Sequence, residues 1–232
     1  MPIAANTPLP SYVSGFLPGE ETVMGQSIQV DASRWQKALA DRGLPSLEGI
    51  LASPGLRHVS RRVVFELGAR DITPENAFQL LYYSLAWGLG KRARKFNKRL
   101  DGLAEDQENT AKLLTEAWTA VRSGEPAEVV YSTLTTSRGK ARIPQFGPAF
   151  STKFLYFAQG PDIPPRYVIL DKVVAGSLHE AWPGAPKAGW YPDAYGRYCS
   201  FISRWADLAT EEINGARKVR ADEIEFTLFT RK

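Results

Sequence analysis

The sequence has very few of the residues that build metal centres and disulfides. Its 232 residues include one cysteine, Cys199, and two histidines, His58 and His179. A single cysteine excludes an intramolecular disulfide and a cysteine-rich zinc or iron–sulfur site, and two histidines supply few metal ligands. We therefore expect a protein that uses no metal and no other cofactor, and that works in the reducing cytoplasm.

Long apolar runs and several familiar motifs are also missing. No run of about 18 apolar residues occurs, the length from which a membrane-spanning helix is recognised. The first residues lack the basic and then apolar pattern of a secretion signal. Neither a dinucleotide-binding glycine motif nor a phosphate-binding lysine loop is present, and two histidines make a Ser-His-Asp set unconvincing. These absences predict a soluble protein and make hydrolases of those kinds poor alternatives.

Capping residues and apolar spacing predict helices along most of the chain. No alternating array of strands, internal repeat or linker divides it, so we expect one all-α domain over residues 1–232. Residues 1–27, rich in proline and glycine, are expected to form an extended arm. A domain of this size buries about 70% or more of its unfolded surface, so it can be a stable monomer. The helices are predicted at 31–42, 60–67, 73–87, 107–122, 126–134, from 148, 171–178, 192–210 and 221–230.

The charge is only mildly basic, with a formal net charge of +4 and an isoelectric point near 9.1. This permits nucleic-acid binding without demonstrating it. The strongest cluster is Lys91 to Arg99, which includes Lys95 and Lys98, and a second group lies at 138–142. Either cluster alone is as well explained by a solvated surface. The cations that we expect to contact DNA phosphates are Lys95, Lys98, Arg138, Lys140 and Arg142.

The most informative stretch begins at Ile143 and contains Gly147-Pro148. Gly147 is expected to make a turn that a residue with a Cβ would resist, and Pro148 is suited to be the first residue of a helix. The first amides of that helix, beginning with Ala149, have no partner within it and lie at the positive end of its dipole. We therefore expect Gly147 and Ala149 to hold a phosphate group of DNA. Further on, Asp171 is placed to cap another helix.

This pattern, Pro144-x-x-Gly147-Pro148, an apolar helix and then Leu170-Asp171, resembles the helix-hairpin-helix superfamily of DNA glycosylases. It is most similar to the 8-oxoguanine glycosylase-like branch, and the resemblance is specific over residues 143–178. It implies two closely packed helical lobes with the active-site cleft between them, and a hairpin-plus-aspartate unit over residues 126–178. In that superfamily the hairpin holds a phosphate, and bifunctional members add a lysine to the aspartate.

The aspartate of the superfamily matches Asp171, whereas the usual lysine position is Ala149. Lys153 lies one helical turn further on, on the same face, and precedes Asp171 by 18 residues, a separation typical of the family pair. We therefore assign Lys153 and Asp171 as the catalytic candidates. The alternatives are a lysine that contacts phosphate or extends to the surface, and an aspartate that only caps its helix.

An enzyme that acts on a base in duplex DNA must first take the base out of the stack into a pocket with flat apolar walls. Five aromatic residues are candidates for these walls: Trp182, Trp190, Trp87, Tyr83 and Tyr82. Trp182 and Trp190 are favoured because they lie in a loop after the Asp171 helix. The alternative for each ring is a place in the hydrophobic core, and the sequence does not indicate which base is bound.

The resemblance implies an enzyme that flips out and excises a modified base from double-stranded DNA, with or without AP lyase activity. Its role would lie in base-excision repair or in defence against phage with modified DNA. The other hypothesis is a non-catalytic hairpin protein that binds DNA or recruits a partner, which Ala149 in the lysine position favours.

Overall fold

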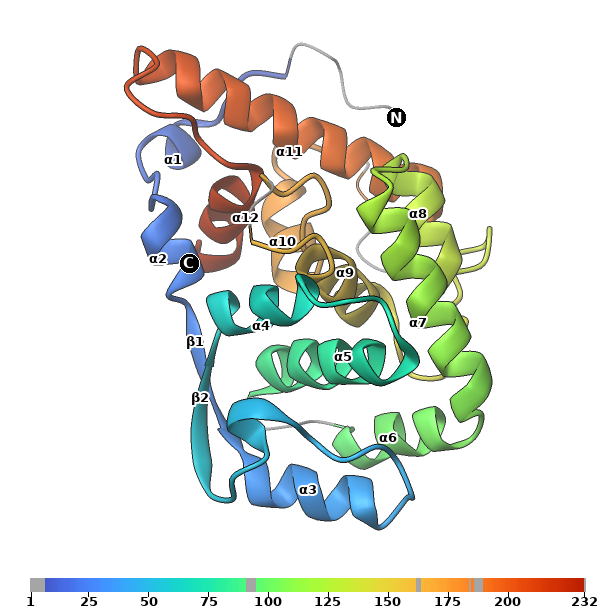
Figure 1. Ribbon diagram of the computed structural model, residues 1–232. Helices are drawn as coiled ribbons and strands as arrows, with labels where there is room; N and C mark the ends of the chain where they lie inside the picture. The colour runs from blue at the N-terminus through green and yellow to red at the C-terminus, as the bar shows by residue number, and fades with distance from the viewer. Residues whose placement is uncertain (1–6, 91–94, 162–163, 184, 186–189, 232) are drawn as a thin grey trace.

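The computed structural model describes residues 7–90, 95–161, 164–183, 185 and 190–231. The fold is mostly helical, as predicted, with one short antiparallel ribbon (Figure 1). Of the described helices, none is long and apolar enough to cross a lipid bilayer. The elements are α1 (Ser11–Ser14), α2 (Glu20–Met24), β1 (Ser27–Asp31), α3 (Ala32–Ala40), η1 (Gly49–Leu51), β2 (Leu56–Ser60), α4 (Arg61–Gly68), α5 (Pro74–Leu89), α6 (Phe96–Ala104), α7 (Gln107–Arg122), α8 (Ala127–Leu134), α9 (Pro148–Phe157), α10 (Lys172–Leu178), α11 (Pro192–Glu212) and α12 (Ala221–Thr230).

Four predicted helix caps are present as hydrogen bonds. Asp31, Ser60 and Thr73 each accept a bond from the amide three residues on, and Asp171 accepts two at the start of α10. These bonds satisfy amides that have no partner within the helix. The helix starts are therefore fixed by local chemistry that the sequence already displays.

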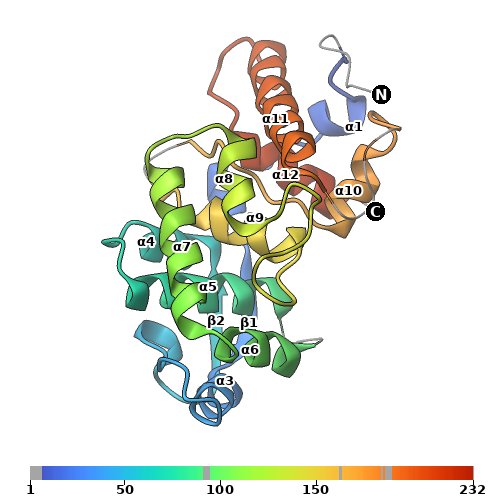
Figure 2. The same ribbon diagram turned by 90° about the vertical axis from the view of Figure 1, so that its right-hand side faces the viewer.

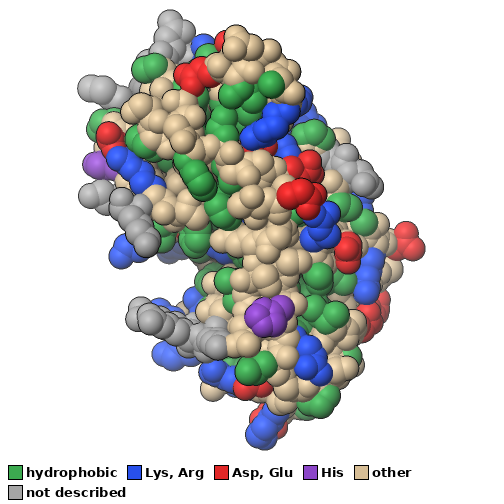
Figure 3. Space-filling view, turned by 90° about the vertical axis from the view of Figure 1, so that its left-hand side faces the viewer, with side chains coloured by type: hydrophobic (Ala, Val, Ile, Leu, Met, Phe, Trp, Pro, Cys, Tyr) green, Lys and Arg blue, Asp and Glu red, His purple; other side chains and the backbone are tan. Residues whose placement is uncertain are grey.

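Helix α5 lies at the centre of the molecule. It is buried without a break over residues 77–87 and packs against α4, α7 and α9. In Figure 1, α3 and α6 lie below it, the ribbon runs along its left side, and α10, α11 and α12 lie above. The buried apolar side chains form one continuous cluster from Val13 to Leu228. Figure 3 shows a hollow in the surface between the upper and lower parts of the molecule, with Lys and Arg side chains on its upper and lower edges.

Two features of the N-terminal region differ from the prediction. The arm over residues 1–27 is not wholly extended, because it contains α1 and α2. The ribbon was not predicted either: β1 and β2 pair antiparallel from Ser27 with Ser60 to Asp31 with Leu56. Each strand has only five residues and its partner lies a whole helix and loop away. The alternating pattern of either strand is therefore too short to be separated from a loop.

The predicted hairpin joins α8 to α9. An isolated bridge between Thr135 and Ala141 closes its connection, and α9 begins at Pro148 as expected. Figure 2 shows the connection descending from α8 toward α6 before it enters α9. Gly102 of α6 lies so close to Pro144 that an added Cβ would come within 2.9 Å of the Pro144 carbonyl oxygen. The α6 helix therefore packs directly beside the hairpin.

The role predicted for Gly147 in the turn is wrong. Gly147 has φ −70° and ψ −176°, an extended conformation open to any residue, and a Cβ added there would meet nothing within 4 Å. The left-handed conformation lies two residues earlier, at Gln145, with φ 67°. The chain therefore turns at a residue with a side chain, and Gly147 serves as the extended residue that must precede a proline.

This difference predicts that Gly147→Ala will stabilise the fold by about 0.4–1 kcal/mol, because alanine adopts the native φ and ψ without strain and has fewer unfolded conformations. Gln145→Val, in contrast, should destabilise it, because a β-branched residue strongly resists a positive φ. Urea unfolding of both variants measures these changes. A stability loss in Gly147→Ala would mean that the turn does require glycine.

Candidate active site

Lys153 and Asp171 lie next to one another. Lys153, on α9, is 5% exposed, and its Nζ is 3.5 Å from Oδ2 of Asp171, the N-cap of α10. The Thr152 hydroxyl accepts a 3.0 Å hydrogen bond from the Leu170 amide, which fixes the segment before Asp171 against α9. A hydrogen bond from a backbone amide to a side-chain hydroxyl thus holds the hairpin helix and the aspartate helix in register beside the charged pair.

The Asp171 carboxylate divides its two oxygens between two tasks. Oδ1 accepts hydrogen bonds from the amides of Val173, at 2.9 Å, and Val174, at 3.1 Å, and Oδ2 faces Lys153. A cap and a charge-stabilising carboxylate are therefore compatible in one residue. The two amide hydrogen bonds to Oδ1 restrict rotation of the carboxylate and thereby hold Oδ2 toward Lys153.

The Lys153 amine is confined from several sides. Nζ donates a 3.1 Å hydrogen bond to the carbonyl of Ala149, and the alkyl chain lies against Gly88 of α5, where an added Cβ would come within 2.8 Å of Lys153 Cδ. Burial lowers the pKa of the Lys153 amine; Asp171 and Glu225 act in the opposite direction, and Arg61 adds to the lowering. A lowered pKa increases the neutral fraction, which is the form that can act as a nucleophile.

Both side chains line a cavity of 180 Å³. Trp87 and Gly88 of α5 form one part of its wall, and Ile28 of β1 forms another. The remaining apolar lining comes from Ile169, which precedes Asp171 in the chain, and from Phe229 of α12. The lining residues come from β1, α4, α5, α9 and α12 and from the segment that ends at Asp171. A larger hollow of 710 Å³ near Cys199 and Val219 contains neither Lys153 nor Asp171. We therefore place the candidate chemistry in the smaller cavity.

Only one of the aromatic candidates lines this cavity. Trp87 does so, and its indole N–H donates to the carbonyl of Gln26 at 3.2 Å. Trp182 and Trp190 are 3% and 2% exposed and pack edge to face with ring centres 5.7 Å apart, outside the cavity wall. The Tyr83 hydroxyl donates to the carbonyl of Glu48 at 2.6 Å, and Tyr82 is buried against Phe78 and Trp35. These four rings contribute to the core.

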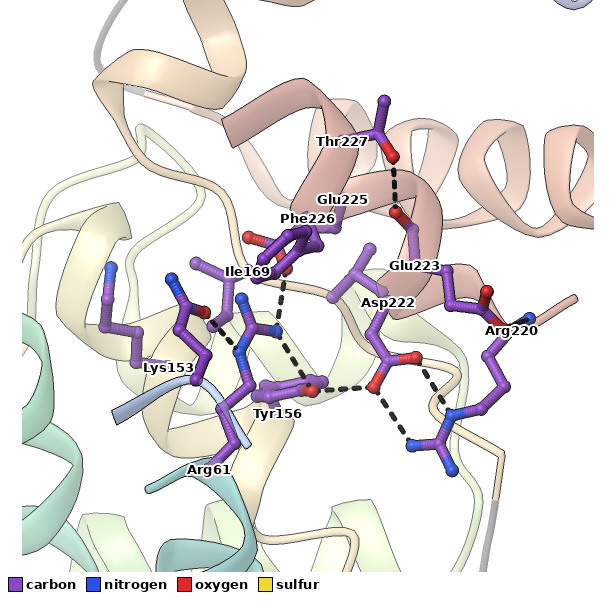
Figure 4. Close-up of polar contacts among 12 residues, drawn as sticks. Arg61, Lys153, Tyr156, Ile169, Arg220, Asp222, Glu223, Glu225, Phe226 and Thr227 are labelled. Carbon is purple, nitrogen blue, oxygen red and sulfur yellow. Dashed lines mark hydrogen bonds and ion pairs between the residues drawn. The ribbon is translucent and has the colours of Figure 1, made fainter. Parts of the chain in front are cut away.

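Sequence reasoning missed a buried polar network behind the lysine (Figure 4). Arg61, fully buried, forms a 2.9 Å ion pair with Glu225, which is 1% exposed, and both residues line the cavity. Arg61 also donates to the hydroxyl of Tyr156 at 3.1 Å, and Tyr156 donates to Asp222 at 2.7 Å. The network thus connects α4, α9 and α12 across the back of the site.

The hairpin presents two unpaired amides. Neither the Gly147 nor the Ala149 N–H has a hydrogen-bond partner among the described residues, whereas the Phe150 N–H donates to the Gly147 carbonyl. Gly147 and Ala149 are both half-buried. Two free amides at the start of a ten-residue helix are suited to a phosphate oxygen.

The predicted phosphate-contacting cations are all exposed. Two of them are Lys95, the N-cap of α6, and Lys98 within α6, and two are Arg138 and Lys140 of the hairpin connection; none of these four forms an ion pair with the described residues. Arg142 has a structural contact, since its Nε donates to the carbonyls at the end of α8 at 3.2 Å. The cations at 91–94 that were also predicted lie outside the described residues. Among the described residues, no cluster of three His, Cys, Asp or Glu could hold a metal ion.

Comparison with curated proteins and with solved structures found no match to the chain. Comparison with protein families matched residues 21–229 to the family described as "Putative 8-oxoguanine DNA glycosylase OGG-like protein". The match includes the hairpin, Lys153, Asp171 and every element that lines the cavity. It agrees with the motif at residues 143–178, and the chain belongs to this OGG-like family.

Proposed function

We propose that the protein is a DNA glycosylase that excises a modified base, with Lys153 as nucleophile and Asp171 as the stabilising carboxylate. The observation that carries the proposal is the buried pair of these two side chains at a cavity beside the hairpin. Membership of the OGG-like family supports the same reaction class.

Base excision breaks the bond between C1′ of the sugar and a ring nitrogen of the base. The sugar ring becomes positively charged in the transition state, and the Asp171 carboxylate is placed to stabilise that charge. The neutral Lys153 amine would attack C1′ and lose a proton, which gives a Schiff base with the opened sugar. That intermediate can be trapped by borohydride and leads to cleavage of the strand.

The cavity is small, so it would take a ligand smaller than a drug-sized molecule, such as a single base. Ligand pockets for drug-sized molecules have about 300–1,000 Å³, and this one has 180 Å³. The rings of Trp87 and Phe229 supply apolar walls for a base that has left the stack. The family description makes 8-oxoguanine the first base to test.

Double-stranded DNA is the partner that this site would require. The unpaired amides of Gly147 and Ala149 would hold one phosphate, and the exposed cations of α6 and of the hairpin connection would hold others. Contacts of this kind position the duplex without reading its sequence, so base selection would depend on the cavity. We expect the protein to act as a cytoplasmic monomer.

Single-turnover incubation with duplexes that contain one modified base tests the proposal. The panel includes 8-oxoguanine, other oxidised purines and bulky modified cytosines, so that its result separates a repair role from defence against phage with modified DNA. We expect release of at least one base and a borohydride-trapped complex with that duplex. If no duplex of the panel loses its base but binding persists, the protein is a non-catalytic hairpin protein, the alternative that Ala149 favours.

The cations give a separate prediction about binding. Neutralising Z phosphates makes the logarithm of the binding constant fall with the logarithm of salt with a slope of about −0.9Z, so losing two contacts should flatten the slope by roughly two units. We expect this for Lys95→Ala/Lys98→Ala and for Arg138→Ala/Lys140→Ala.

The matched control is Lys37→Ala/Lys112→Ala, which removes two exposed lysines that pair within their own helices, with Asp41 and Glu116. Fluorescence anisotropy with a fixed duplex over a series of salt concentrations measures all three slopes. An unchanged slope in either test variant would assign that cluster to a solvated surface.

A further inference from the structure

Arg61 has one hydrogen-bond donor without an acceptor in the part of the chain that the structure describes. Its Nε donates to the side-chain oxygen of Gln26 at 2.8 Å, and its Nη1 donates to Tyr156 at 3.1 Å and to Glu225 at 2.9 Å. Nη2 is buried and has no acceptor among the described residues. Figure 4 shows this nitrogen on the side of Ile169, which also lines the cavity.

An unpaired nitrogen on a buried cation is unusual, because buried polar groups nearly always find a partner. The rest of the guanidinium is fully engaged, so the free donor is not the result of a loosely packed side chain. Arg61 itself is 0% exposed and lines the cavity that contains Lys153 and Asp171. The guanidinium therefore borders the space in which a bound ligand could supply the missing acceptor.

The guanidinium is also held rigidly. Its central carbon lies 5.0 Å from the ring centre of Trp87, 5.3 Å from that of Tyr156 and 5.7 Å from that of Phe226. Tyr156 is fixed in turn by its 2.7 Å bond to Asp222. A donor fixed before the reaction needs no reorganisation when charge develops, which is the condition for strong electrostatic stabilisation.

Base excision produces negative charge as well as positive charge. When the C1′–N bond breaks, its electron pair leaves with the base, which becomes an anion until it takes up the proton that the attacking amine loses. Asp171 faces the sugar side of this charge separation. Within the described part of the cavity wall, Arg61 is the cation other than Lys153, and Lys153 must be neutral to attack.

We propose that the free Nη2 of Arg61 donates a hydrogen bond to the flipped base and stabilises the negative charge of the base as it leaves. Arg61 would then be a catalytic residue of the glycosylase reaction, on whose assignment this inference rests. The ligand is a base that presents an acceptor at this edge, either a carbonyl oxygen or an unprotonated ring nitrogen. Glu225 and Tyr156 act as positioning residues, because they hold the guanidinium and do not meet the sugar.

The test separates base release from chemistry on DNA that has already lost its base. Arg61→Lys keeps the charge opposite Glu225 but loses the fork that supplies the free donor. Arg61→Met/Glu225→Gln removes both charges of the pair, so that no unpaired carboxylate remains buried. The matched control is Arg62→Met/Glu21→Gln, which removes the neighbouring arginine and its exposed partner.

Three measurements are made on each folded variant, and a melting curve establishes folding. They are single-turnover release of the base that the wild-type protein excises, binding of a duplex with a tetrahydrofuran abasic analogue, and borohydride trapping on a duplex with a natural abasic site. We expect base release to fall about 100- to 1,000-fold in both Arg61 variants, the usual loss for one fixed donor. Binding to the abasic analogue and trapping on the abasic site should stay at the wild-type level, as should all three measurements in the control.

Two results would overturn the inference and leave the proposed function standing. If base release and abasic-site trapping fall together, Arg61 only supports Lys153; if base release persists, the free donor is not used. If the wild-type protein traps no abasic site, binding to the tetrahydrofuran duplex replaces that measurement. If the wild-type protein releases no base from any duplex of the panel, the proposed function is wrong and this inference with it.

Discussion

Asp171→Asn is expected to reduce base release about 100- to 1,000-fold or more, the loss that accompanies removal of one fixed electrostatic contact to a transition state. The amide has the size of the carboxylate but no charge, so it cannot stabilise a positive sugar ring. Its oxygen can still accept from the amides of Val173 and Val174, which Asp171 Oδ1 now caps. The helix should therefore persist, and DNA binding should be retained or become tighter because one negative charge near the phosphates is lost.

Asp31→Asn is the matched control for this variant. Asp31 caps α3 through the Arg34 amide at 3.1 Å, but it forms no ion pair with any residue that the structure describes. The same chemical change should leave base release unaffected there. Single-turnover release, duplex binding and a melting curve are measured for both variants. Wild-type release from folded Asp171→Asn protein would show that Asp171 is only a helix cap, and the site would have to lie elsewhere.

The sequence predicted those parts of the fold whose chemistry is local. The caps at Ser60, Thr73 and Asp171 bond amides only two or three residues away, and Pro148 starts α9 because a proline loses nothing at that position. The hairpin and the aspartate helix were placed by the same short-range signals. Their proximity in space was implied by the family resemblance alone.

The polar network was missed because it joins distant residues. Arg61 and Glu225 are 164 positions apart, and each alone has the pattern of an exposed charge. A signal was nevertheless present in α12. Asp222 and Glu225 are three residues apart and share a face with Phe229, so an apolar helix carries two acids on the side that must be buried. That arrangement predicts buried partners for the acids without indicating which basic residue supplies them.

The aromatic candidates were misplaced because the packing direction of a ring cannot be read from its neighbours in sequence. Trp182 and Trp190 lie in a loop, but their rings pack against each other with centres 5.7 Å apart, and Trp190 also packs against Tyr198 with ring centres 6.1 Å apart. Trp87 reaches the cavity because it lies near the end of α5, where the helix meets β1 and α9. Because these two rings pack against each other, neither of them lines the cavity, although each alone had the position in sequence expected of a cavity wall.

Lys153→Gln is expected to abolish borohydride-trapped complexes between the protein and DNA, because glutamine cannot form a Schiff base. If the enzyme is bifunctional, base release falls with them. If a water molecule held by Asp171 is the nucleophile, release largely persists. Lys172→Gln is the matched control, because Lys172 is exposed and directly follows Asp171. Trapping on an abasic-site duplex and single-turnover base release are measured for both variants.

The pH dependence of release identifies the group that controls the reaction. Burial lowers the pKa of the Lys153 amine, so the neutral, nucleophilic fraction is small below that pKa and grows as the pH rises through it. If Lys153 is the nucleophile, wild-type release should rise tenfold per pH unit on the acid side and level off above the lowered pKa. That pKa must lie below the ordinary lysine value of about 10.4. Trapped complexes in Lys153→Gln protein, or a rising limb at the same pH in that variant, would contradict this assignment, because the titrating nucleophile would then be another group.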